Sequence, residues 1–295
     1  SADGTALYAA EETADRVLVI TEFLNSAGTI ASGRAQESRL AVPVRGPAAL
    51  ISNEEEVRVF GFLGRQTTRI GSGSEMARSL RRTRRQRLAP DIELGRDLFY
   101  RSRDARLATT VDDMSCSSCH FDGRSDGITW TSLMVTGQTP SLAGPVSSKA
   151  PLRWTGDRSS IQDDARQAIE RLEGTGLSDE ELDALAAYVD FIPAVQTPKI
   201  NAATEQRGRA AFERANCAGC HAGPLLTDRH TQTPQIKGVL TPSLLGLAGS
   251  SPYFRDGSAR SLAEVIPLHP MGVEADRPQL SDAETSDLLE YLRSL

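Results

Sequence analysis

The sequence of 295 residues lacks several features that would assign it to common classes of protein. No apolar run approaches the roughly 18 to 20 residues that a membrane-spanning helix needs, so we expect no membrane span. There is no excess of positive charge either, because 33 Lys and Arg against 39 Asp and Glu give a net charge of −6. This balance argues against nucleic acid as a partner.

Cysteine and histidine are also scarce, with four of each, so their positions are informative. All four cysteines lie in two C-x-x-C-H motifs, at 116–120 and 217–221. This motif attaches c-type haem: two thiols one helical turn apart form thioethers to the porphyrin, and the following His binds iron from one face. We therefore predict two covalently bound haem c groups. Their protein ligands would be Cys116, Cys119, His120, Cys217, Cys220 and His221.

Two other uses of paired cysteines suit this pattern less well. A zinc site built from four thiolates would not require a His directly after each pair. A thioredoxin-like dithiol has no need of that His and normally lies in a βαβ context, which this sequence does not show. Covalent haem is the interpretation that uses every residue of both motifs.

The predicted haems also bear on localisation and partners. In bacteria, c-type haem is attached outside the cytoplasmic membrane, whereas this chain opens with the polar residues Ser1-Ala2-Asp3-Gly4 and no signal peptide. We expect that an export signal preceded these residues, and we place the protein in the periplasm or at the cell surface. A small soluble redox protein or another electron donor or acceptor is the natural partner of such a chain.

Residues 1–75 differ from the rest of the chain. Short runs rich in β-forming residues alternate with Gly, Asn, Asp and Ser, which favours antiparallel strands. The runs lie at Ala6–Ala10, Arg16–Ile20 and Val57–Phe62. They resemble blades of a YncE-type or NHL-type β-propeller but cover fewer than two blades, and a propeller needs about four to eight. We expect either a propeller completed elsewhere, in a larger complex, or a small sheet packed on the cytochrome part.

Residues 76–90 form an arginine-rich linker. The six arginines of this segment are Arg78, Arg81, Arg82, Arg84, Arg85 and Arg87. We favour a solvated linker helix here over a docking patch for an acidic partner or for haem propionates.

Beyond the linker the sequence repeats. Cys116 corresponds to Cys217 at an offset of 101, and the T-P-S-L segment at 139–142 corresponds to the one at 241–244 at an offset of 102. A slowly drifting offset indicates two copies of one domain with small insertions. The predicted copies are residues 91–197 and 198–295.

Each copy ends in a predicted amphipathic helix. Ser178 with Glu181, and Ser281 with Glu284, form S-x-x-E capping boxes. The apolar stripes that follow are Leu185, Tyr188, Val189 and Ile192 in the first copy and Leu288, Tyr291, Leu292 and Leu295 in the second. A first helix, C-x-x-C-H, a T-P-S-L loop and a final helix make the class I cytochrome c layout, in which the first and last helices cross. We predict a mainly α fold of two tandem class I cytochrome c domains, preceded by a small β-rich, propeller-like segment.

Residues 90–295 resemble the bacterial di-haem cytochrome c peroxidase family, which includes the MauG-type enzymes that oxidise a partner protein. The T-P-S-L segment at 241–244 and the S-P-Y-F-R-D-G-S segment at 251–258 carry this resemblance. The family implies a distal iron ligand thirteen residues after Asp256, which here is His269, and Met271 is the competing ligand. Two imidazoles favour a low-spin haem of lower potential than His with Met.

The first haem departs from that arrangement, because no histidine occurs between His120 and His221. Met134 could bind the iron through sulfur; otherwise the sixth position is open and able to bind peroxide. We favour the open site, and Met134 as a packing residue is compatible with it. The family's peroxidatic haem is the N-terminal one.

The resemblance implies roles for further residues. Trp154, in a segment similar to the family's F-W-D-G-R, would pass electrons between the haems. Glu170 and Glu173 lie near the position of the family's acid–base Glu, which moves a proton during peroxide cleavage, but neither falls in register. His230 would serve local hydrogen bonding. Backbone carbonyls at Ser250 and Pro252 would bind a calcium ion.

Together these patterns predict an exported di-haem c-type cytochrome. Electrons would enter at the C-terminal haem, pass through Trp154 and support hydrogen peroxide reduction, or MauG-like oxidation, at the N-terminal haem. The alternative is a non-catalytic electron-transfer subunit with two six-coordinate irons, attached to a larger redox complex through its β-rich N-terminus.

Overall fold

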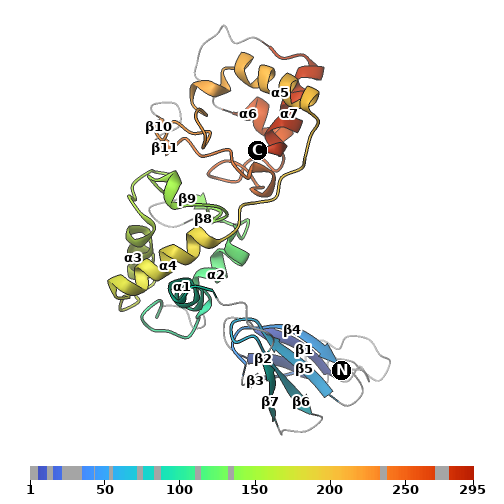
Figure 1. Cartoon of the computed structure of the whole chain (residues 1–295), viewed down its shortest axis with the longest axis vertical. Helices are drawn as coiled ribbons and strands as arrows, with labels where there is room; N and C mark the ends of the chain where they lie inside the picture. The colour runs from blue at the N-terminus through green and yellow to red at the C-terminus, as the bar shows by residue number, and fades with distance from the viewer. Residues whose placement is uncertain are drawn as a thin grey trace. The chain divides into compact units, whose positions relative to one another are not determined.

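The computed structural model describes most of the chain, in two compact units. Ser1–Ser118 and Ile169–Glu181 form the first unit, and Cys119–Ala168 and Leu182–Leu295 form the second (Figure 1). In the described part no helix combines the length and apolar character that a membrane crossing needs. The described residues are 6–11, 16–21, 35–42, 44–52, 56–71, 76–82, 88–109, 114–131, 136–232, 238–269 and 279–295, with the backbone alone for 71 and 76–82.

The first unit begins with two antiparallel sheets, and the strands predicted from the sequence are present in them. One sheet has the order β1-β2-β3 and the other the order β4-β5-β6-β7 (Figure 1). Valines of both sheets share one buried core, including Val17 and Val59 with no exposed surface. The strands are β1 (Ala6–Glu11), β2 (Arg16–Thr21), β3 (Gln36–Ala41), β4 (Pro47–Ser52), β5 (Glu56–Gly61), β6 (Gln66–Gly71) and β7 (Met76–Arg82).

The expected linker helix over the arginine-rich segment is wrong for residues 76–82, which form strand β7. This strand pairs antiparallel with β6, from Gln66 opposite Arg82 to Ile70 opposite Met76. Pairing satisfies the backbone groups that β6 would otherwise leave open, and charged side chains are common on such edge strands because they oppose further pairing. Residues 83–87 lie outside the described residues, so the docking-patch alternative stays a prediction.

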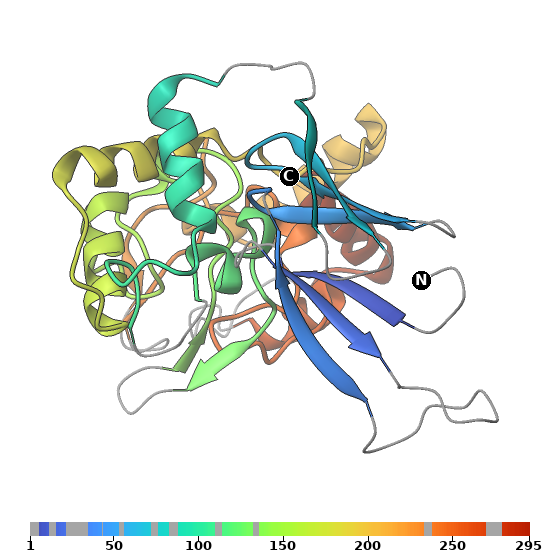
Figure 2. The same cartoon turned by 90° about the horizontal axis from the view of Figure 1, so that it is seen from below.

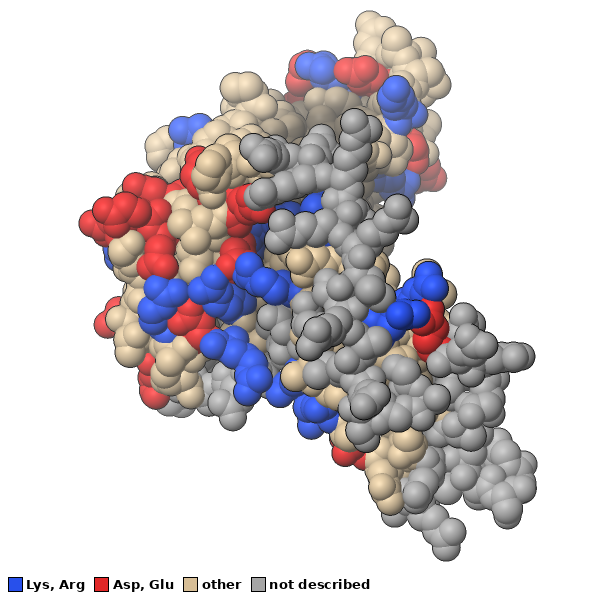
Figure 3. Space-filling view, turned by 60° about the horizontal axis from the view of Figure 1, so that its bottom comes forward, with Lys and Arg blue, Asp and Glu red and all other residues tan. Residues whose placement is uncertain are grey.

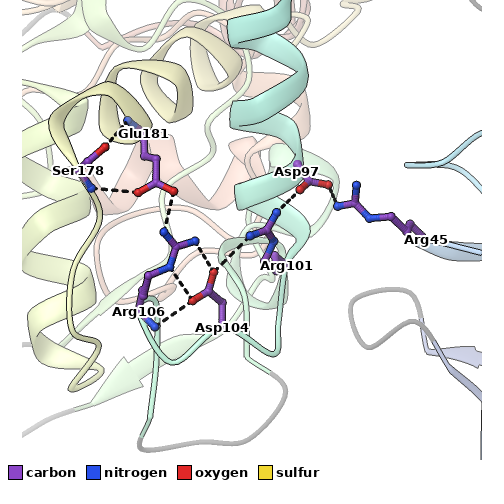
Figure 4. Close-up of polar contacts among 7 residues, drawn as sticks. All are labelled: Arg45, Asp97, Arg101, Asp104, Arg106, Ser178 and Glu181. Carbon is purple, nitrogen blue, oxygen red and sulfur yellow. Dashed lines mark hydrogen bonds and ion pairs between the residues drawn. The ribbon is translucent and has the colours of Figure 1, made fainter.

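A helix and an ion-pair network follow the sheets in the first unit. Helix α1 (Pro90–Tyr100) starts with Pro at its first turn, and the ring of Tyr100 packs edge-on against Phe62 at 4.8 Å between centroids. Beyond the helix, Arg106 binds Asp104 through two hydrogen bonds, of 3.0 and 2.7 Å, and Glu181 through a third of 2.7 Å (Figure 4). Glu181 also accepts from the backbone N–H of Ser178 at 3.0 Å, as its predicted capping box requires.

The hydrogen bonds from Arg106 lower the pKa of Asp104 from its ordinary value of 3.8 to about 2. Arg101 contributes a further contact to Asp104 and pairs with Asp97, which also contacts Arg45 (Figure 4). On the face shown in Figure 3, Lys and Arg side chains gather beside a group of Asp and Glu side chains, so charges of both signs lie close together.

Helices are the main regular elements of the second unit (Figure 2), and its last helix packs across an earlier one as predicted (Figure 1). Helices α5 (Ala202–Arg214) and α7 (Asp282–Ser294) meet at Gly208, where a methyl group would lie 2.4 Å from the Asp287 carbonyl oxygen. Phe212 packs edge-on against Tyr291 at 5.7 Å. The other helices are α2 (Cys116–Cys119) and α3 (Ile161–Arg171), which continue from one unit into the other, α4 (Asp179–Phe191), which starts in the first unit, and α6 (Leu262–Leu268).

The apolar stripes and capping boxes predicted for the final helices are confirmed. Ser281 and Glu284 form both hydrogen bonds of a capping box at the start of α7. The stripe residues are buried or pack on the core: Leu185, Tyr188, Val189, Ile192, Leu288, Tyr291, Leu292 and Leu295.

Two pairs of short strands in the second unit have matching surroundings. Strands β8 (Thr129–Thr131) and β9 (Thr136–Gln138) form one hairpin, and β10 (Thr231–Gln232) and β11 (Val239–Leu240) form the other. A turn follows each hairpin. One is closed by a bridge between Leu152 and Arg158, with φ +67° at Arg153, and the other by a bridge between Tyr253 and Ala259, with φ +67° at Phe254.

We expect the Asp104→Asn substitution to lower the free energy of unfolding by about 1–2 kcal/mol at pH 7, because Arg106 loses its carboxylate partner. The folded-state pKa of Asp104 lies below its ordinary value, so this carboxylate stabilises the fold above about pH 4, and its contribution is lost as the pH falls toward 2. Urea unfolding of the wild type and the variant should therefore show a difference in the free energy of unfolding that narrows as the pH falls from about 4 toward 2. An equal difference in the free energy of unfolding at pH 7 and at pH 2 would contradict a stabilising role of the ionised Asp104. Glu180→Gln, on the exposed surface, is the control.

The Gly208→Ala substitution should destabilise the helix crossing by about 1–3 kcal/mol, because the added methyl group meets the backbone of α7. Helix propensity alone would favour alanine by about 1 kcal/mol. Thermal unfolding measures the net effect, and a rise in the melting temperature would show that the helices do not pack closely here. Ala210→Gly, on the exposed side of the same helix, gives the propensity effect by itself.

Candidate haem sites

The second C-x-x-C-H motif forms a tight turn beside the C-terminal core. Cys217–Gly219 is a single 3-10 turn, and the backbone N–H of His221 donates to the Cys217 carbonyl at 2.9 Å. Cys217 is half-buried and packs against the core, whereas Cys220 is exposed. The turn therefore holds two thiols near the surface and directs the imidazole of His221, which is only 7% exposed, inward.

A hydrogen bond sets the orientation of His221. Its Nδ1 donates to the carbonyl of Leu226 at 3.2 Å, which leaves Nε2 as the nitrogen with a free lone pair. Burial lowers the pKa of this imidazole, against the opposing effect of the Leu226 and Pro242 carbonyls and of Asp228. A neutral imidazole with Nδ1 satisfied is the form that binds a metal through Nε2.

His269 lies opposite His221, at the end of α6. The two ring centroids are 6.1 Å apart, with 67° between the ring planes. Bonds of about 2.0–2.1 Å from each imidazole nitrogen would let both rings reach one metal at this separation. The ring of Phe254 lies 6.0 Å from that of His269, and Val265 and Ile266 add apolar surface. The donor set and its apolar surroundings fit a haem iron held between two histidines.

The first motif forms a comparable turn. Helix α2 holds Cys116 and Cys119 half-buried and one turn apart. The Nδ1 of His120 donates to the carbonyl of Pro140 at 3.0 Å, so Nε2 is again the nitrogen left for a metal. Burial lowers the pKa of His120, against weaker effects of the Pro140 carbonyl, Asp164 and Asp126. The residues of this motif thus also fit a covalently attached haem.

The structure brings Trp154 next to the segments that support both motifs. Its indole N–H donates to the carbonyl of Gln138 at 2.9 Å, two residues before the Pro140 that binds His120. Its own carbonyl accepts from the N–H of Leu240 at 2.7 Å, two residues before Pro242. Trp154 therefore lies between the two T-P-S-L segments.

The remaining predicted site residues are exposed or lie outside the described residues. Glu170 and Glu173 are exposed, and Glu173 has φ +59°. The side chain of His230 is 81% exposed, and its backbone N–H donates to Asp228 at 2.9 Å. Met134 and Met271 fall in 132–135 and 270–278, outside the described residues, so their roles stay predictions.

Sequence reasoning missed Gln138, which is 6% exposed and lies beside the carbonyl of Pro252, one of the two expected calcium ligands. Its Nε2 donates to the carbonyls of Pro252 and Phe254, at 2.9 and 2.6 Å. Ser250 directs its hydroxyl to Gly246. An amide donor thus takes the carbonyl that a cation would bind, and this arrangement does not fit calcium. A polar side chain directly before T-P was the only signal in the sequence.

The four cysteines do not converge on one metal. Among the described residues, no three His, Cys, Asp or Glu side chains are grouped so that they could hold an ion. A four-cysteine zinc site therefore has no support in this part of the chain, which includes both motifs.

Comparison with known proteins agrees with this geometry. Residues 205–295 match the cytochrome c family, in which haem c is bound covalently. No curated protein matches the sequence. Two solved structures share 22% sequence identity with the chain. Hydrazine synthase of Kuenenia stuttgartiensis, pressurised with xenon, has a TM-score of 0.52 over 69% of this chain and 87% of that chain. A MauG-like protein associated with microbial copper homeostasis has a TM-score of 0.50 over 70% of this chain and 88% of that chain. The likeness to both structures is one of fold, and residues 205–295 form a cytochrome c domain.

Proposed function

We propose that this protein is an exported di-haem c-type cytochrome that performs peroxidase-type or MauG-like oxidation at its N-terminal haem. The observation that carries the proposal is the 6.1 Å separation of the His221 and His269 rings, which would let both histidines hold one iron. His120 has no histidine of its own domain to complete such a pair. A haem held by two histidines and a haem with one open position would divide electron transfer and peroxide binding between the two sites.

Reciprocal contacts support two tandem cytochrome c domains. The N–H of Gln138, in the first hairpin, donates to the carbonyl of Arg255 in the second turn at 2.8 Å. The N–H of Leu240, at the corresponding place in the second hairpin, donates to the carbonyl of Trp154 in the first turn at 2.7 Å. Equivalent residues in each repeat thus make the same bond to the other, as two copies of one domain would.

The residues of the C-terminal site would store and pass electrons. Cys217 and Cys220 would attach the haem, and His221 and His269 would bind its iron from both faces. Two imidazole ligands would make this haem low-spin and of low potential. It is suited to electron transfer and closed to peroxide.

The residues of the N-terminal site would carry out the chemistry. Cys116, Cys119 and His120 would hold the haem, which supplies an iron that exchanges electrons and, with one position open, binds hydrogen peroxide. Trp154 would carry electrons between the sites through its contacts with both T-P-S-L segments. Glu170 or Glu173 would move the proton that peroxide cleavage requires. The MauG-like description of one protein of this fold agrees with oxidation chemistry.

The second candidate is an electron-transfer subunit without catalysis. The exposure of Glu170 and Glu173 favours it, because an acid–base group for peroxide cleavage acts within the haem pocket. The β-rich N-terminal segment would then join the cytochrome to a larger redox complex, and a small redox protein would be the partner in either case.

His269→Ala should convert one haem from low-spin to high-spin, because the substitution removes an axial ligand. EPR of the oxidised holoprotein measures this change, and the signal of the other haem should stay as in the wild type. His230→Ala is the matched control, since this exposed histidine should leave both signals unchanged. Retention of two unchanged signals in His269→Ala would show that another residue binds the second iron.

Hydrogen peroxide should be turned over by the wild-type protein, with one high-spin haem visible by EPR. Trp154→Phe should slow turnover about tenfold when electrons are supplied through the C-terminal haem, a change of about 1.4 kcal/mol in barrier, and leave both haem spectra unchanged. Phe191→Leu, at an exposed aromatic position, is the control. Two low-spin haems in every redox state, with no peroxide consumed, would select the electron-transfer subunit instead.

A further inference from the structure

One buried side chain, the amide of Gln138, holds two carbonyls of the turn at 252–256. Its Nε2 donates to the carbonyls of Pro252 and Phe254, at 2.9 and 2.6 Å. The backbone N–H of the same residue donates to the carbonyl of Arg255 at 2.8 Å. Gln138 is the last residue of strand β9, in the hairpin drawn as green arrows in Figure 2. A single residue thus makes three hydrogen bonds to this turn.

Two carbonyl oxygens that converge on one point repel each other unless positive charge lies between them. Backbone carbonyls are common calcium ligands, because the cation neutralises this repulsion. Amide N–H groups carry partial positive charge, and the Nε2 of a glutamine has two of them, enough for one bond to each carbonyl. Gln138 therefore supplies, with a neutral side chain, the positive charge that a cation would supply.

The turn depends on such support because its backbone is strained at Phe254, where φ is +67°. The ring of this residue lies 6.0 Å from that of His269. A methyl group on Gly257 would lie 2.7 Å from Oγ1 of Thr129 and 3.4 Å from Nε2 of Gln138, so the turn packs closely on the hairpin. Loss of the bond to the Phe254 carbonyl would free the ring that packs on His269.

The other hairpin makes the backbone bond without the side-chain bonds. Leu240 corresponds to Gln138 at an offset of 102, and each of them precedes a Thr-Pro pair. Leu240 donates its backbone N–H to the turn of the first repeat, at Trp154, but its side chain has no donor. A leucine is therefore compatible with the backbone bond at this place. The amide is specific to the turn that packs on His269.

We propose that Gln138 is a positioning residue that takes the place of a bound cation: its amide fixes the turn and, through Phe254, holds His269 as a ligand of the second iron. Gln138 also lies two residues before Pro140, whose carbonyl accepts from His120 at 3.0 Å. Its bonds therefore connect the two candidate haem sites. This inference rests on the proposed ligation by His269, and it implies that haem ligation in this protein needs no divalent cation.

The wild-type holoprotein tests this implication without any substitution. After treatment with EGTA, addition of calcium should change neither the EPR signal nor the reduction potential of either haem. Isothermal titration calorimetry should show no stoichiometric calcium binding. Calcium binding that shifts the EPR signal or the potential would overturn the inference, because a cation would then be needed where the amide lies.

Gln138→Glu tests the positioning role. The substitution keeps the length of the side chain but replaces the donor with a carboxylate, which only accepts hydrogen bonds when ionised. In EGTA the two carbonyls should repel it, so part of the second haem should become high-spin. Calcium should restore the low-spin signal, since it binds a carboxylate together with backbone carbonyls. Calorimetry should show calcium binding at least about tenfold tighter than in the wild type.

Two further variants separate this effect from general damage. Gln138→Leu, which introduces the residue that the other repeat has at the equivalent position, should show the partial high-spin signal without rescue by calcium. Gln206→Glu, at an exposed position of α5, makes the same change of charge and should show neither effect. Rescue by calcium in Gln138→Glu alone is the result that a merely structural role would not give.

The outcomes separate this inference from the proposed function. Unchanged haem signals in both Gln138→Leu and Gln138→Glu, measured in EGTA, would overturn the positioning role. Calorimetry does not require His269 to bind iron. Calcium binding acquired by Gln138→Glu would therefore support the replacement of a cation even if His269→Ala left both haem signals unchanged, a result that would overturn the proposed ligation alone.

Discussion

The hydrogen bond from the imidazole of each motif to a backbone carbonyl is the contact on which both candidate haem sites depend. His120 donates to Pro140 and His221 to Leu226, so in each ring the proton is on Nδ1 and Nε2 is left for iron. The acceptors are main-chain atoms, and their positions are therefore set by loop conformation rather than by a side chain. Iron ligation in this fold is only as well ordered as the loops that carry these carbonyls.

The two hairpins connect those loops to one another through hydrogen bonds. The residues before each Thr-Pro pair, Gln138 and Leu240, donate their N–H groups to the turn of the opposite repeat. The side chain of Gln138 adds two bonds to the turn at 252–254, and Phe254 packs on the ring of His269. A shift of an axial ligand in one site would thus reach the loop of the other through a few directly bonded residues. The proposed electron transfer between the two sites would require such coupling.

Features encoded within a few residues were predictable from the sequence, and features that depend on distant partners were not. The capping box of Ser281 and the buried stripe of α7 follow from local spacing, and the structure contains both. Strand β7 was missed because its conformation is decided by the open edge of β6, which local composition does not reveal. Gln138 and Trp130 were missed for the same reason. Their acceptors lie in other segments, and a lone glutamine or tryptophan gives no sign of them.

The sequence repeat also explains how similar loops and hairpins can hold two candidate haem sites that differ in their side chains. Trp130 and Gln232 each donate to an Asp and a Thr with nearly the same hydrogen bonds. The surrounding loops therefore keep the same conformation whether the donor is an indole or an amide. Positions that accept either donor can differ between the repeats, and the loops still keep the conformation that would orient His120 and His221 toward a haem iron. The side chains near the two motifs then differ: the ring of His269 lies 6.1 Å from that of His221, whereas no histidine follows His120 before His221. Under the proposed function, the repeated loops would hold two similar haems, and a small number of tolerant positions would make one of them reactive.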